Sequence, residues 1–75
     1  MTNKPTAINF YRRPHGCERY LIGVARYGQR WKSETRGWRF YPNVAGRRAS
    51  SKLHATWEQC VPRWVDYPDG CESEV

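Results

Sequence analysis

A shortage of aliphatic side chains limits what this chain can fold into. Four tryptophans, five tyrosines and two phenylalanines make up 15% of its 75 residues. A chain of this length buries about 60% of the surface that its unfolded form exposes, so its core is thin. Each buried aromatic side chain removes roughly 150–250 Å² from water. The sequence therefore predicts a single basic domain, residues 1–75, with a ring-rich core and some rings left on the surface.

Cationic and aromatic residues are interleaved between Arg12 and Lys52, and the formal net charge is +6. Only Glu18 and Glu34 are acidic in that stretch, and every later acid lies at or beyond Glu58. A surface of one sign that also carries flat rings is typical of proteins that bind a polyanion. An acidic protein would suit the same charge, so the composition does not name the partner.

Membrane and secretory signals are missing from the sequence. No apolar run approaches the roughly 18 residues needed to span a bilayer, and residues 1–9 lack the apolar stretch of a signal peptide. We therefore expect a cytoplasmic protein with no membrane partner. Three cysteines, Cys17, Cys60 and Cys71, then fit free thiols better than a disulfide framework.

Metal and catalytic sites are not indicated either. Structural zinc sites usually have Cys or His ligands in pairs two to four residues apart, and here only His15 and Cys17 are close. Acid–base catalysis needs a perturbed pair of groups in a cleft, and the basic part of the chain offers few acids. We expect no cofactor, no metal and no enzymatic activity; a nuclease that uses His15 or His54 is the weaker alternative.

Alternating and β-rich segments predict the strands. Residues 7–13 alternate between two faces, and so do residues 38–41. Residues 19–27 have a neutral interior, which indicates a central strand, and Gly23 within it marks a bulge or a close approach by a helix. We expect a shorter fourth strand over residues 48–53.

The period changes towards the C-terminus. Five residues share the stripe of an amphipathic helix: Trp57, Cys60, Val61, Trp64 and Val65. Thr56 is the expected N-cap, and Pro62 should kink or break the helix because a proline removes a helical hydrogen bond. Residues 1–6 and 71–75 are expected to be flexible ends, the second of them an acidic tail.

Together these elements predict an α+β fold, a small antiparallel sheet of three or four strands with one C-terminal helix packed on one face. The helix would cover the face that carries Ile8, Phe10, Trp38 and Phe40. Antiparallel sheets commonly leave the other face wet. By alternation, that face holds Tyr11, Arg13, Arg39 and Tyr41.

This outline resembles sheet-plus-helix DNA-binding modules such as integrase arm-binding domains and plant AP2 domains. The likeness covers residues 19–65. Within it, residues 51–60 are similar to the strand-to-helix junction of those modules, where a threonine caps a helix that carries an acid. Pro62 departs from the pattern, and no family residue is transferred to this chain. Small basic chains of this style are also frequent in phages and mobile elements, which suggests a phage-like origin.

The wet face and the neighbouring basic loops are the predicted contact surface. Arginine forms bidentate hydrogen bonds with phosphate, and tyrosine can stack on an unpaired base. The candidate nucleic-acid-binding residues are Tyr11, Arg13, Arg30, Lys32, Arg39, Tyr41, Arg47 and Arg48. The alternative explanation is structural: Arg–Tyr pairs stabilise neighbouring strands, and cationic loops keep a protein soluble.

The sequence favours a non-enzymatic nucleic-acid-binding domain, for DNA in the first place, with an accessory or regulatory role. The competing hypothesis is a protein-interaction module or small inhibitor that docks on an acidic partner. Its anchor would be an exposed tryptophan such as Trp31, because Trp and Arg dominate binding hot spots. A third hypothesis is self-association through an exposed sheet edge. The oligomeric state stays open.

Overall fold

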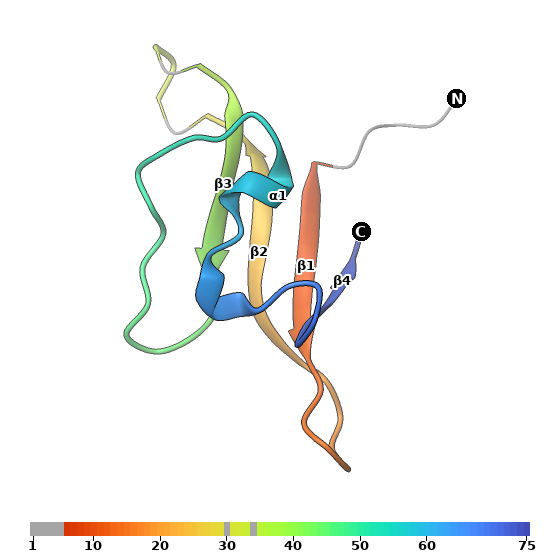
Figure 1. The fold of residues 1–75 in the computed structure, drawn as a ribbon. Coiled ribbons are helices and arrows are strands. Elements are labelled where there is room, and N and C mark those ends of the chain that lie inside the picture. Colours follow the sequence, from red (N-terminus) through yellow and green to blue (C-terminus); the bar gives the residue numbers. More distant parts are fainter. Residues whose placement is uncertain (1–5, 30, 34) are drawn as a thin grey trace, which may run out of the picture.

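The computed structural model describes residues 6–29, 31–33 and 35–75. Its strands form one antiparallel sheet in the order β3-β2-β1-β4, with a short helical segment on one face (Figure 1). The elements in chain order are β1 (Ala7–Arg12), β2 (Tyr20–Gly28), β3 (Gly37–Pro42), α1 (Trp57–Cys60), the 3₁₀ turn η1 (Arg63–Val65) and β4 (Glu72–Glu74). The α+β class, the antiparallel sheet and the central position of β2 are confirmed.

The helical part is broken at Pro62, one of the two outcomes that the sequence predicted, and is shorter than the one packed helix expected for the fold. It consists of one α-helical turn and one 3₁₀ turn, separated at Val61 and Pro62. Val61 is extended, with φ −73° and ψ 120°, as a residue before proline prefers. The predicted cap is present: the Thr56 hydroxyl accepts a hydrogen bond from the Gln59 amide at 3.4 Å. The proline therefore broke the helix without moving its apolar stripe away from the sheet.

The fourth strand is not the one predicted. Residues 48–53 form no strand; the loop in which they lie returns to β3, where His54 and Trp38 exchange backbone hydrogen bonds. The strand is formed instead by Glu72–Glu74, which pairs antiparallel with β1. These residues had been expected in a flexible tail. The buried Cys71 anchors the start of β4, and arginines beside β1 attract its acids, so the tail joins the sheet.

The core is a layer of rings and a few aliphatic residues between the sheet and the helical segment. Phe10 is fully buried, and its ring centroid lies 5.7 Å from that of Phe40, 5.9 Å from that of Trp57 and 5.3 Å from that of Tyr67. The buried set is Ile8, Phe10, Ile22, Ala25, Trp38, Phe40, Cys60, Val65 and Cys71. The predicted inner face of Ile8, Phe10, Trp38 and Phe40 is confirmed.

Gly23 makes this core possible. It pairs with Phe10 of β1, next to an irregularity in the β1–β2 register that a bulge explains. A side chain at Gly23 would overlap the ring of Phe40, which reaches across β2 from β3. The sequence indicated a bulge or a close approach by a helix at this glycine. The register irregularity fits a bulge, but the close approach is made by the ring of Phe40 from the neighbouring strand and not by a helix.

Arg12 ties the helical segment back to the sheet. Its guanidinium donates hydrogen bonds to the carbonyl oxygens of Trp64 and Val65, at 3.1 and 3.0 Å. Those carbonyls lie at the end of η1, where backbone acceptors lack helical partners. Arg12 therefore caps η1 and is committed to a structural contact. Within the described ranges, no helix has the length and apolar character that a bilayer crossing requires.

We predict that Gly23→Ala destabilises the protein by about 1–3 kcal/mol, because the added methyl group overpacks the core against Phe40. Urea unfolding followed by tryptophan fluorescence would measure the change. Gly28→Ala is the matched control on the same strand, since no described atom lies within 4 Å of the position of its Cβ. Its effect should stay below about 0.5 kcal/mol. Equal stability of the two variants would contradict the role given to Gly23.

Candidate functional site

The sheet face opposite the helical segment, here called the outer face, carries two different charge clusters. On its β2–β3 half, Arg26 and Arg39 are direct cross-strand partners. Like charges placed opposite one another on a sheet repel unless other groups compensate them. Arg26 is exposed, whereas Arg39 is only 2% exposed.

The burial of Arg39 differs from the prediction that it lies on a wet surface. Its side chain does belong to the outer face, but the loop that follows β3 lies against it. The guanidinium donates a hydrogen bond to the carbonyl oxygen of Ser51 at 3.0 Å. Arg39 therefore holds this loop in place, and its positive charge contributes to the electrostatic potential of the outer face from a buried position.

A hollow of about 190 Å³ opens on this half of the outer face. It is lined by Arg26, Tyr27, Gly28, Gln29, Gly37, Arg39, Tyr41 and Leu53, all of them described residues and none of them acidic. Tyr41 is 37% exposed. The ring of Tyr27 belongs to the inner face, where it packs on its cross-strand partner Trp38 with the two ring centroids 5.6 Å apart. The hollow thus combines two guanidiniums with one partly accessible phenol ring, that of Tyr41.

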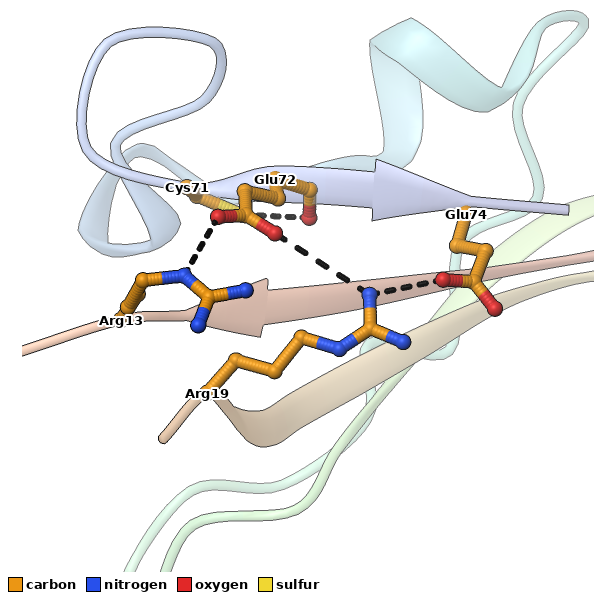
Figure 2. Close-up of polar contacts among 5 residues, drawn as sticks. All are labelled: Arg13, Arg19, Cys71, Glu72 and Glu74. Atoms are coloured by element: carbon orange, nitrogen blue, oxygen red, sulfur yellow. Dashed lines mark hydrogen bonds and ion pairs between the residues drawn. The ribbon is translucent and has the colours of Figure 1, made fainter. Parts of the chain in front are cut away.

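The β1–β4 half of the outer face is a network of ion pairs (Figure 2). Arg13 Nε lies 3.1 Å from Glu72 Oε1. Arg19 Nη1 lies 2.7 Å from Glu74 Oε2 and 4.0 Å from Glu72 Oε2. The Arg19 guanidinium also stacks on the Tyr11 ring, with its Cζ 4.0 Å from the ring centroid. Its hydrogen bond to Glu74 raises the pKa of Arg19 further above its ordinary value.

The predicted loop residues do not gather in one place. Lys32 is exposed in the β2–β3 loop, close in sequence to the Gln29 side of the hollow. Arg30 lies outside the described residues. Arg47 stacks on the ring of Trp64, with its Cζ 4.8 Å from the centroid, so it packs against the helical segment. Arg48 follows it and is exposed.

The structure also adds residues that the sequence did not select. Arg26 joins the site because β2 and β3 pair in a register that sets it opposite Arg39. The glycines at Gly28 and Gly37, which face each other at the end of the hairpin, could have indicated this register. Glu72 and Glu74 join it because β4 pairs with β1, and three residues are too few for an alternation signal to identify a strand.

Two further hollows lie elsewhere and have acids in their walls. One, of about 380 Å³, lies beside Arg13, Asp69 and Glu72. The other, of about 440 Å³, lies beside Glu58, Arg63 and Asp66. Their carboxylates make both less suitable than the β2–β3 hollow for a polyanion.

The cysteines and histidines are dispersed. Cys17 is exposed, whereas Cys60 and Cys71 are buried as free thiols. Desolvation by burial raises the pKa of Cys60 to about 11, and it also raises the pKa of Cys71. In the described part of the chain, no three His, Cys, Asp or Glu residues are grouped so that they could hold a metal ion.

No family model, no curated protein and no solved structure matches this chain. The resemblance to sheet-plus-helix DNA-binding modules and the phage-like origin therefore remain predictions from the sequence.

We predict that stability falls between pH 8 and pH 11 through Cys60. Its raised pKa means that the folded state holds the thiol proton to a higher pH than the unfolded state. The resulting stabilisation is complete below the unfolded pKa and is lost as the pH rises towards 11. Urea unfolding of the wild type and of Cys60→Ala should show their stability difference narrowing by about 2 kcal/mol over this range. A constant difference would contradict the prediction.

Proposed function

We propose that the protein is a non-enzymatic nucleic-acid-binding domain with an accessory or regulatory role, and that DNA is its ligand. The observation that carries the proposal is the hollow of about 190 Å³ on the outer face, whose described walls contain two arginines, the ring of Tyr41 and no acid. Guanidinium forms bidentate hydrogen bonds with phosphate. A phenol ring at the same site provides a stacking surface for a base.

The size of the hollow favours a macromolecule over a small metabolite. Sites that enclose a small organic ligand usually measure about 300–1,000 Å³, and this hollow is smaller. It can accept one group of a larger ligand whose remainder lies along the sheet surface. A nucleic acid meets this requirement because it presents phosphates and bases in a repeating order.

The tyrosine at the hollow favours an unpaired base at the point of contact. Tyr41 is partly exposed and lies beside the arginine pair. Bases inside a duplex are stacked on one another and offer no free face to a phenol ring, whereas single strands do. Lys32 in the adjoining loop, and Arg36 before β3, add cationic groups that can hold the backbone without distinguishing its sequence.

We predict binding of labelled single-stranded DNA with a Kd of roughly 10⁻⁶–10⁻⁴ M at physiological salt, weakening steeply as salt rises. Fluorescence anisotropy with single-stranded DNA, duplex DNA and RNA, each at about 50 and 200 mM salt, would measure it. If none of the three binds at the lower salt, the proposal is wrong.

The hollow itself is tested by Arg26→Gln, which should weaken binding about tenfold because one charge-assisted contact is lost, and should reduce the salt slope by about one. The matched control is Arg63→Gln, an equal loss of charge at an exposed residue of η1, on the opposite side of the sheet. It should change the affinity by less than about threefold, through net charge alone. Equal losses in the two variants would place the contact elsewhere.

The second candidate is the protein-interaction module or small inhibitor, and one observation favours it. Trp31 is 64% exposed, compared with 47% for Tyr20 and 43% for Tyr27. An accessible Trp with cations nearby is the usual anchor for a protein partner. In a pull-down from cell extract, a partner that stays bound after nuclease treatment and no longer binds the Trp31→Ala variant would support this candidate. If Trp31→Ala also leaves the affinity for DNA unchanged, the protein-binding and DNA-binding surfaces are different.

A further inference from the structure

We propose that the carboxylates of β4 occupy an anion-binding site on the outer face, and that nucleic-acid phosphates displace them. β4 would then act as a built-in competitor that lowers the affinity for a polyanion. This inference rests on the proposed function, because it concerns the same face and the same ligand. It assigns a role to Glu72 and Glu74 that goes beyond pairing with β1.

The cationic half of this site has the composition of a phosphate-and-base contact. Arg13 and Arg19 approach from the β1–β2 connection, and the Arg19 guanidinium covers the Tyr11 ring. In Figure 2 the carboxylates of Glu72 and Glu74 point from β4 towards these two guanidiniums. Each carboxylate therefore takes the place at which a phosphate oxygen would accept the same hydrogen bonds.

The two acids also have the spacing of a repeating polyanion. Residues two apart in a strand project to the same side, at roughly 6.5–7 Å along the chain. Their partners on β1, Asn9 for Glu74 and Tyr11 for Glu72, confirm that both acids lie on the outer face. An extended single strand presents its successive phosphates at a comparable interval. β4 therefore resembles a short stretch of nucleic-acid backbone laid across the arginines.

The ion pairs between the β4 carboxylates and the arginines are accessible enough for a phosphate to replace the carboxylates. The four side chains of the network are 36–53% exposed, so water and salt screen their attraction. The strand itself is held from the other side: Cys71 is buried in the core, and the hydroxyls of Tyr67 and Ser73 lie 3.1 Å apart. The backbone of β4 can stay in the sheet while its two carboxylates turn away from the arginines.

Displacement would extend the contact surface. With the acids turned away, Arg13, Arg19 and Tyr11 become available on the same face as the hollow formed by β2 and β3. The two clusters lie about 10 Å apart across the sheet, two strand spacings, and about 16 Å apart along it, because Arg26 pairs with Ala7 whereas Tyr11 pairs with Leu21. One extended strand of several nucleotides can reach both. While the carboxylates of Glu72 and Glu74 pair with the arginines, a ligand with several adjacent negative charges would displace them more readily than a single anion would.

The test compares Glu72→Gln/Glu74→Gln with a matched double variant, Glu58→Gln/Asp66→Asn, in the full chain. Both variants raise the net charge by two, but Glu58 and Asp66 line the hollow beside the helical segment. The probe is a labelled 15-nucleotide oligothymidylate, followed by anisotropy from low to physiological salt. We expect the β4 variant to bind about tenfold more tightly than the wild type, with a steeper salt dependence, and the matched variant to gain no more than about threefold.

Equal gains in the two double variants, or no gain in the β4 variant, would overturn the inference while the proposed function stands. If no form of the protein binds the oligonucleotide, the proposed function fails and the inference falls with it. Thermal unfolding checks that both variants are folded. Glu74→Gln alone keeps the pair of Arg13 with Glu72 and the pairing of β4, so it serves if the double variant is unstable; about a threefold gain is expected from it.

Discussion

Phe10 and Phe40 meet across the middle of the sheet because Gly23, on the strand between them, carries no side chain. The remaining core is arranged around this contact: Trp57 and Tyr67 from the C-terminal part pack on Phe10 as well. A chain with few aliphatic residues needs such dense ring packing, because a thin domain buries little surface in other ways. The helical segment consequently covers one face of the sheet, and the outer face carries charged residues, with the loop at Ser51 lying over Arg39.

The outer face is divided by charge. Its β2–β3 half carries the exposed Arg26 opposite the buried Arg39, with Tyr41 beside them. On its β1–β4 half, Glu72 and Glu74 neutralise the arginines. This division cannot be read from the net charge of the chain. All five late acids follow the basic stretch in sequence, but two of them, Glu72 and Glu74, lie against its arginines in the folded protein. The proposed function rests on the β2–β3 half. The proposed competition of Glu72 and Glu74 with the ligand rests on the β1–β4 half.

The reliability of the sequence predictions depended on the range of the interactions behind them. The apolar stripe ending at Val65, the Thr56 cap and the break at Pro62 are local effects, and all three were predicted. The alternation of β1 and β3 correctly separated inner from outer residues. Arg39 was expected in water but is buried, because the loop that reaches Ser51 covers it, and no local pattern describes where a loop returns. The role of β4 was missed for the same reason.

By itself, the sequence determined the first three strands, the turns between them, the ring-rich inner face and the place where the helix breaks, because each depends on residues within a few positions of one another. Only the tertiary structure decided which strands are neighbours, that Arg26 faces Arg39, and that the acidic end of the chain lies on the basic outer face. Those features depend on the pairing of segments far apart in the chain. Their free energy comes from burial and charge contacts that exist only after the sheet has formed.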